Sequence, residues 1–361
     1  MIPLITLSVF DGISCGAVAL DRAGIQVETY YASEIEENAI AISKQNHANI
    51  VQLGDVTRWR EWDIPWDRID LLIGGSPCQG FSRAGKGLNF KDPRSRLFFV
   101  FVEILNHIRT VNPDVKFLLE NVKMKTEWRD VITEHLGVEP IEINSKLFSA
   151  QNRLRTYWTN IPISRPLEDK GVVLLDVLET DIDTAGFIEH DGILFSPTIS
   201  EASRNLVRVV DGEVRISQDV KQGYIVAENG DGVNISFPTS KSRRGRVIKQ
   251  KSSTVDCVCN ICVLQDGVIR RLTVRELERL QTLPEGYTDG FSPGIAQKAI
   301  GNGWTVDVLT HIFSGLAEEP VEEVHTTNRA VDLEKEQMRE MLLDMAKVFN
   351  EMSQHILEVC R

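Results

Sequence analysis

The chain has 361 residues, of which 42% are hydrophobic and 25% charged, and its formal net charge is −12. This length exceeds what one compact core usually holds, so we expect one large domain and a smaller lobe. No apolar run approaches the roughly 18 residues of a membrane span and the N-terminus lacks a basic signal region, which predicts a cytoplasmic protein with no membrane partner. The six cysteines show no disulfide spacing, and the cytoplasm would keep them reduced.

From residue 4 to residue 160, short β-branched runs alternate with helical patterns. The pattern predicts strands at 4–10, 27–33, 50–53, 69–73 and 117–119, and helices at 16–23, 36–47 and 97–109. This alternation is typical of an α/β fold with a doubly wound, mostly parallel sheet. We expect this first domain to cover residues 1–164.

After residue 164 the alternation is lost. Residues 165–252 are rich in Gly, Asp, Asn and β-branched residues, which predicts a smaller lobe of mixed β and irregular structure. A capping box of Thr273 and Glu276 begins an amphipathic helix at 272–283. A glycine turn and a helix at 301–313 follow, so we expect residues 253–316 to return to the first domain.

The end of the chain is acidic. Residues 317–361 contain 11 acidic and 5 basic residues and so carry −6, half of the total charge. Apolar residues recur at heptad-like spacing from Met338 to Val359, which predicts a helical tail. Packing of this helix on its own domain and self-association through it both stay open.

Cys78 follows the predicted strand at 69–73 on a turn rich in Pro and Gly, PCQG. Open α/β sheets bind ligands at the carboxyl ends of their strands, and a thiol on such a turn stays accessible. Free cysteines are more often small buried hydrophobic residues. Its place on this turn nevertheless makes Cys78 a candidate nucleophile.

Three acidic residues close three successive strands. Asp11 lies in a glycine-containing turn before the first helix, which suits an anionic group but is a weak signal by itself. Glu34 ends the second strand, where a carboxylate can accept hydrogen bonds from both ribose hydroxyls. Asp55 follows the third strand and could bind an adenine amino group. Together these acids predict a nucleoside site.

A fourth acid and two arginines complete the candidate site. Glu120 begins the triplet ENV after the strand at 117–119, and beside a nucleophile it could act as a general acid instead of a helix cap. Arg153 and Arg155, in the segment QNRLR, would face one side of a strand. They could orient a planar polar substrate or its phosphate.

In this order the motifs resemble the DNA (cytosine-5) methyltransferase family. The similarity runs through residues 8–16, 34, 55, 74–82, 120–122, 151–155, 270–281 (RRLTVRELERLQ) and 301–306 (GNGWTV). Several motifs look like the animal de novo branch, whereas Asn302 follows the bacterial pattern, on a chain of bacterial or phage size. Trp304 departs from the family, in which a valine is more usual.

The resemblance implies a Rossmann-like enzyme that uses S-adenosylmethionine to methylate C5 of a cytosine flipped out of a specific duplex DNA sequence. Cys78 would add to C6 as a thiolate, and Glu120 would hold and protonate N3. Arg153 and Arg155 would contact the cytosine O2 and the neighbouring backbone. The reaction needs no metal. A restriction-modification or phage-protection role is implied.

The resemblance also assigns the cofactor site. Phe10 would stack on the adenine, Glu34 would bind the ribose and Asp55 the adenine amino group. The other predicted cofactor-binding residues are Asp11, Gly12, Ile13, Gly16, Ile35, Val56, Ser76, Pro77, Asn302 and Trp304.

DNA binding is predicted despite the negative net charge, because the charge is locally basic. Residues 80–94 would form a loop that closes over the flipped base, and the lobe at 165–252 would read the target in the major groove. The basic run KSRRGR at 241–246 would otherwise be a solvated loop. The predicted DNA-binding residues are Arg83, Lys86, Lys241, Arg243, Arg244 and Arg246.

Two other functions stay open. A tRNA-modifying branch shares the Cys and ENV motifs, but the large lobe favours DNA. A catalytically silent DNA-binding subunit is disfavoured by the intact Cys78 and Glu120. The cysteines at 257, 259 and 262 lack a fourth ligand nearby, so we expect a strand there and no zinc site.

Overall fold

The computed structural model describes residues 2–77, 96–165, 167–241, 245–258 and 261–317. Five predicted site residues and the acidic tail lie outside these ranges. In the part of the chain that the structure describes, no helix is both long and apolar enough to cross a membrane. The site residues outside the described ranges are Cys78, Arg83, Lys86, Arg243 and Arg244.

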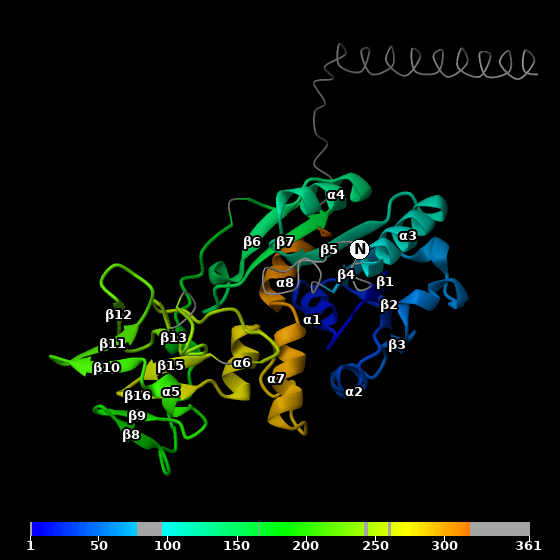
Figure 1. The fold of residues 1–361 in the computed structure, drawn as a ribbon. Coiled ribbons are helices and arrows are strands. Elements are labelled where there is room, and N and C mark those ends of the chain that lie inside the picture. Colours follow the sequence, from blue (N-terminus) through cyan, green and yellow to red (C-terminus); the bar gives the residue numbers. More distant parts are fainter. Residues whose placement is uncertain (1, 78–95, 166, 242–244, 259–260, 318–361) are drawn as a thin grey trace, which may run out of the picture. The chain divides into compact units, whose positions relative to one another are not determined.

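A seven-stranded sheet organises the first part of the chain (Figure 1). Its order is β3-β2-β1-β4-β5-β7-β6, and the neighbours from β3 to β5 are parallel, whereas β7 and β6 pair antiparallel. The predicted doubly wound, mostly parallel sheet is therefore confirmed. The strands are β1 (Leu4–Val9), β2 (Val27–Ser33), β3 (Val51–Gln52), β4 (Leu71–Gly75), β5 (Lys116–Val122), β6 (Ile141–Asn144) and β7 (Leu154–Thr159).

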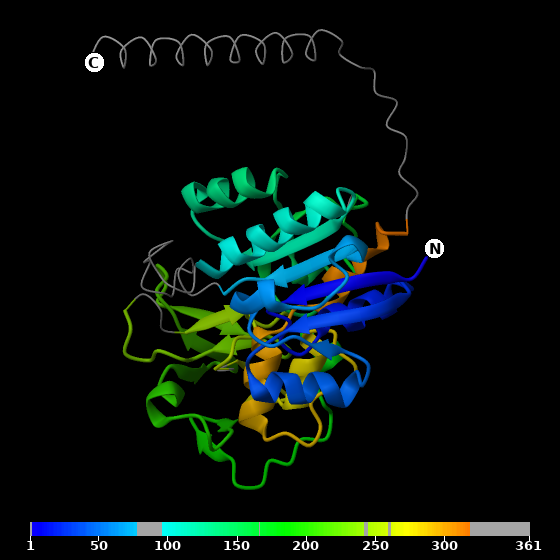
Figure 2. The same ribbon diagram turned by 90° about the vertical axis from the view of Figure 1, so that its right-hand side faces the viewer.

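Helices cover both faces of this sheet. Helices α3 and α4 lie on one face, above the sheet in Figure 2, and α1, α2 and α8 lie on the other. Because side chains alternate along a strand, Ile73 packs with α1 and α8 whereas Leu72 packs with α3. The helices are α1 (Cys15–Arg22), α2 (Glu37–Asn46), α3 (Arg96–Val111), α4 (Thr126–Leu136), α6 (Val274–Leu280), α7 (Pro293–Asn302) and α8 (Val306–Ser314).

The lobe contains two further sheets with their own buried core. One has the order β10-β11-β12 and the other β14-β13-β15-β16-β9-β8. The second sheet extends past residue 252 to Arg271. Its strand β15 begins at Cys262, which is buried. The lobe elements are β8 (Ile188–His190), β9 (Ile193–Phe195), α5 (Glu201–Arg204), β10 (Val207–Val210), β11 (Glu213–Ser217), β12 (Tyr224–Ala227), β13 (Gly232–Asn234), β14 (Arg246–Ile248), β15 (Cys262–Gln265) and β16 (Val268–Arg271).

Local sequence signals explain which elements could be foreseen. Thr273 caps α6 and both halves of the capping box with Glu276 are present, as predicted. Helices α4 and α7 and strand β6 were not predicted. Helix α7 contains Gly294 and Gly301, which lower helix propensity, so packing on the rest of the chain must stabilise it.

Candidate active site

The carboxyl ends of β1 and β4 form the switch point of the doubly wound sheet, where such folds bind ligands. A cavity of about 290 Å³ lies there. Its wall combines residues from the carboxyl ends of β1, β2, β4 and β5 and from the start of β7 with the end of α7 and the turn before α8. The predicted residues that meet in this wall are Phe10, Asp11, Gly12, Glu34, Ser76, Pro77, Glu120, Arg153, Arg155, Asn302 and Trp304.

Glu120 and Arg155 form an ion pair in this wall, with Nε of Arg155 2.9 Å from Oε1 of Glu120. The pairing of β5 with β7 places Val122 opposite Arg155, so Glu120 is a diagonal neighbour on the same face. The second oxygen of Glu120, Oε2, accepts a hydrogen bond from Nε1 of Trp304 at 3.2 Å. Sheet register and a distant indole together orient this carboxylate.

Glu34 is held rigidly at the end of β2. Its Oε2 accepts from the backbone N–H of Gly12 at 2.8 Å, and its Oε1 accepts from those of Ile35 and Glu36 at 2.8 and 2.9 Å. The terminal torsion of a glutamate is otherwise broad. Among the described residues, Oε2 accepts only this one hydrogen bond and has a lone pair left for another donor, so Glu34 is a pre-oriented acceptor that fits a hydroxyl of a nucleoside.

Asp11 stabilises the turn that lines the cavity. Its carboxylate accepts hydrogen bonds from the hydroxyls of Ser14 at 2.5 Å and Tyr30 at 2.7 Å. Burial raises the pKa of Asp11 to about 6. Phe10 and Ser14 adopt φ of 59° and 61°, the left-handed region that side chains rarely occupy. The buried hydrogen bonds of Asp11 therefore hold a strained turn, a role that the sequence did not reveal.

Arg153 is buried and bound to the chain itself. Its two terminal nitrogens donate to the carbonyl oxygens of Val255 at 2.7 Å and Gly303 at 2.9 Å. Burial, together with the nearby charge of Arg155, lowers the pKa of Arg153 to about 10. Arg153 thus joins two distant segments of the wall, its own and that of Gly303, to Val255 behind them. A direct contact between Arg153 and a base stays a prediction.

Asn121 and Gly75 contribute in ways that the motifs alone did not show. The side-chain amide of Asn121 donates to Oγ of Ser76 at 3.0 Å, so it anchors the turn that leads into Cys78. A Cβ on Gly75 would lie 2.8 Å from Nε1 of Trp304 and 3.2 Å from Oε2 of Glu120. Only glycine leaves room there for the indole and the carboxylate to meet.

The remaining predicted cofactor-binding residues do not line this first cavity. Ile13 lines a neighbouring cavity of about 300 Å³ between α2 and α7, which shares Glu34 and Asn302 with the first. Asp55 caps a 3₁₀ helix (Val56–Glu61), and its Oδ1 accepts from the N–H and hydroxyl of Thr57. Four of the described residues that were predicted to bind the cofactor line neither cavity. They are Gly16, Ile35, Asp55 and Val56.

The basic run of the lobe is only partly available for a ligand. Lys241 and Arg246 are exposed. Lys249 is 2.9 Å from Asp231, and Lys251 donates to the carbonyl oxygens of three residues at 146, 149 and 172. Lys249 therefore stabilises the lobe, and Lys251 connects the lobe to the first domain.

Two solved structures share this architecture. The chain aligns with the Entamoeba histolytica methyltransferase EhMeth at a TM-score of 0.58 and 15% identity, covering 88% of this chain and 100% of that one. It aligns with Spodoptera frugiperda DNMT2 at 0.52 and 17%, covering 87% and 100%. At such identities the likeness concerns the fold alone. The chain therefore has the α/β methyltransferase fold, with the cavity at the switch point of its sheet.

Sequence comparison defines the family within this class. The family model for C-5 cytosine-specific DNA methylases matches residues 4–318. The type II methyltransferase M1.ScrFI of Lactococcus lactis subsp. cremoris is 30% identical over 81% of this chain and 73% of its own length. The type II methyltransferase M.NlaX of Neisseria lactamica is 28% identical, over 85% and 94% respectively. The chain therefore belongs to the C-5 cytosine-specific DNA methylase family, which confirms the resemblance seen in the motifs.

Proposed function

We propose that this enzyme transfers a methyl group from S-adenosylmethionine to C5 of a cytosine flipped out of a specific duplex DNA sequence. One observation carries the proposal: the paired Glu120 and Arg155 share a single cavity wall with the rigid acceptor Glu34. Pro77, which precedes Cys78 in the sequence, lies on the same wall. The arrangement supports binding of the target base and the cofactor in this one cavity, next to the nucleophile.

The described residues fit the cofactor. When bound, S-adenosylmethionine supplies an electrophilic methyl group. Glu34 would accept from its ribose and Phe10 would stack on its adenine. Asp55, whose Oδ1 binds Thr57 and which lines neither described cavity, would bind the adenine amino group through Oδ2. Gly12 has a φ of 61°, and a Cβ there would meet nothing within 4 Å, so the turn stays open toward the cofactor.

The chemistry would run through Cys78 and Glu120. The Cys78 thiolate would form a bond to C6, and the electron pair of the C5–C6 double bond would move through the ring. Glu120 would hold and protonate N3, which stabilises that charge. C5 would then accept the methyl group as its bond to the sulfonium sulfur breaks, which leaves the cofactor as a neutral thioether. Loss of the C5 proton would restore the double bond and expel the sulfur of Cys78, and N3 would return its proton to Glu120.

Recognition of DNA would fall to the lobe. Flipping a base out of a duplex costs a few kcal/mol, and contacts between the protein and the DNA would offset this cost. The exposed Lys241 and Arg246 flank Gly245, whose φ is 54° and whose added Cβ would lie 2.0 Å from the carbonyl oxygen of Ser217. This close approach supports a position of Gly245 and the neighbouring Arg246 beside β11. We propose a cytoplasmic restriction-modification or phage-protection role, in keeping with the type II relatives.

Transfer of tritium from labelled S-adenosylmethionine tests the function directly. We expect label in duplex DNA, with bisulfite sequencing of plasmid from an expressing host showing one methylated sequence motif. Label in tRNA instead would assign the chain to the tRNA-modifying branch. Label in neither would favour a silent accessory subunit.

Glu34→Ala is expected to weaken S-adenosylmethionine binding by roughly 1.5–3 kcal/mol, the contribution of hydrogen bonds to a charged group. Isothermal titration calorimetry measures the change. Glu28→Ala removes the same charge from the same strand, where the carboxylate pairs with Arg68 on the surface, and should leave the affinity unchanged. Equal affinities for the two variants would place the ribose elsewhere.

A further inference from the structure

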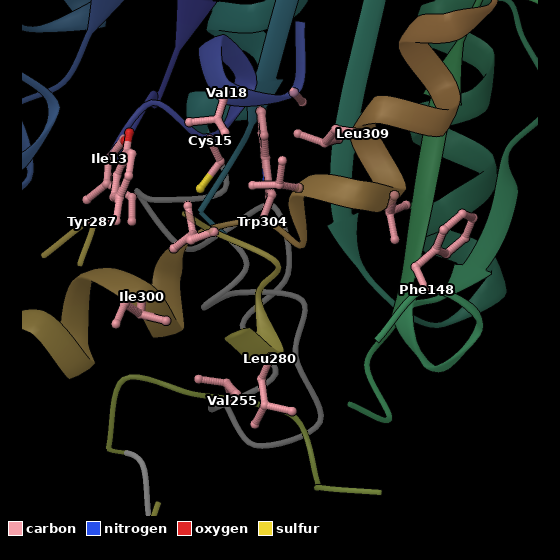
Figure 3. Packing of buried hydrophobic residues seen from close by; sticks show 14 of the residues in the cluster. Ile13, Cys15, Val18, Phe148, Val255, Leu280, Tyr287, Ile300, Trp304 and Leu309 are labelled. Carbon is pink, nitrogen blue, oxygen red and sulfur yellow. The ribbon is translucent and has the colours of Figure 1, made fainter. Parts of the chain in front are cut away.

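Trp304 lies between α7 and α8 and is 7% exposed. It belongs to the buried cluster that also contains Cys15 and Leu309 (Figure 3). Gly75 makes room for its ring, because a Cβ there would lie 2.8 Å from Nε1 and 3.1 Å from Cζ2. Gly16 lies beside the ring at ordinary contact distance, with an added Cβ 3.7 Å from Cζ3. The ring is therefore fixed between the end of β4 and the start of α1.

The polar edge of this ring faces Glu120. The indole N–H donates to Oε2 at 3.2 Å while Arg155 holds Oε1 at 2.9 Å. One donor would leave the carboxylate free to turn about its broad terminal torsion. Two donors from separate elements fix the plane of the group. Glu120 itself is 8% exposed, so water has little access to replace either donor.

We propose that Trp304 is a positioning residue for Glu120, which holds the carboxylate in the orientation that meets the target base. This inference rests on the proposed function, in which Glu120 acts on N3 of cytosine. An indole N–H is a neutral donor that does not ionise, so it can hold Oε2 whether or not Glu120 carries a proton. A valine at this position would offer no such donor.

The alternative is that Trp304 serves only the cofactor, as the sequence suggested. The two roles predict different losses in Trp304→Phe, which keeps an aromatic ring beside Gly16 but removes the N–H. Loss of a cofactor contact lowers the affinity for S-adenosylmethionine. Loss of a positioning contact lowers the rate of methyl transfer when DNA and S-adenosylmethionine are both saturating.

A double-mutant cycle with Glu120→Gln tests the inference. We expect Trp304→Phe to lower the saturated single-turnover rate at least about ten-fold in the wild-type background, as for a hydrogen bond to a charged group. In the Glu120→Gln background, which itself loses about 100-fold or more, it should lower the rate less than about two-fold. The dissociation constant of S-adenosylmethionine should change less than about three-fold.

Trp158→Phe is the matched control. This buried indole donates to the hydroxyl of Thr133 at 2.9 Å, away from the cavity, so its loss should leave the rate unchanged. Rates are expressed per active site, titrated with DNA that carries 5-fluorocytosine, so that partial unfolding does not affect them. An equal loss in both backgrounds, or a loss confined to cofactor affinity, would overturn the inference. A wild-type enzyme that transfers no methyl group would instead overturn the proposed function.

Discussion

Duplex DNA with 5-fluorocytosine at the target position is expected to form a covalent, denaturation-resistant complex with this enzyme, and Cys78→Ala is expected to abolish it. In the proposed reaction the sulfur leaves C6 only after C5 loses its proton. Fluorine at C5 cannot depart as a proton does, so the adduct accumulates once the methyl group has been added. The complex is measured by denaturing gel electrophoresis, and mass spectrometry of the digested complex should find the DNA on residue 78.

Cys257→Ala supplies the control for this experiment. Cys257 is an exposed free cysteine, so it would react if the complex arose from nonspecific thiol chemistry. We expect this variant to form the complex as the wild type does. A complex that survives Cys78→Ala would remove Cys78 from the mechanism.

Glu276→Gln is expected to lower the free energy of unfolding by about 3–5 kcal/mol, the cost of breaking a buried ion pair. The carboxylate of Glu276 is 0% exposed and binds Arg270 through both oxygens, at 2.6 and 2.8 Å. It also accepts from the backbone N–H groups of Glu179 and Thr273. The substitution leaves the charge of Arg270 buried without its partner and weakens the junction of the lobe with α6.

Urea denaturation followed by circular dichroism measures this loss. Glu28→Gln makes the same chemical change in the pair with Arg68, where the two side chains are 44% and 57% exposed. Exposed pairs contribute about 0–1 kcal/mol, so this control should unfold nearly as the wild type does. Similar losses in the two variants would show that the buried pair has no special role in stability.

The sequence predicted the fold best where the signals are local. The apolar run before Gly75, the strand end before Glu34 and the capping box at Thr273 each depend on neighbouring residues, and each element is present. The strand at 117–119 is also present, but it extends through Glu120 to Val122. The failures also have local causes. Asp55 was assigned to the end of a strand, yet β3 has only two residues and the acid caps a 3₁₀ helix instead.

Most strands and the edge at which they meet could be predicted from the sequence, because periodicity and turn chemistry are local and parallel strands present their carboxyl ends at one edge. The contacts among the residues at this edge could not be predicted from the sequence. Arg153 binds carbonyl groups more than 100 positions away, at Val255 and Gly303. Trp304 reaches Glu120 across 184 positions. Such contacts leave no periodic trace in the chain, since they depend on side-chain packing between elements that meet only in the folded protein.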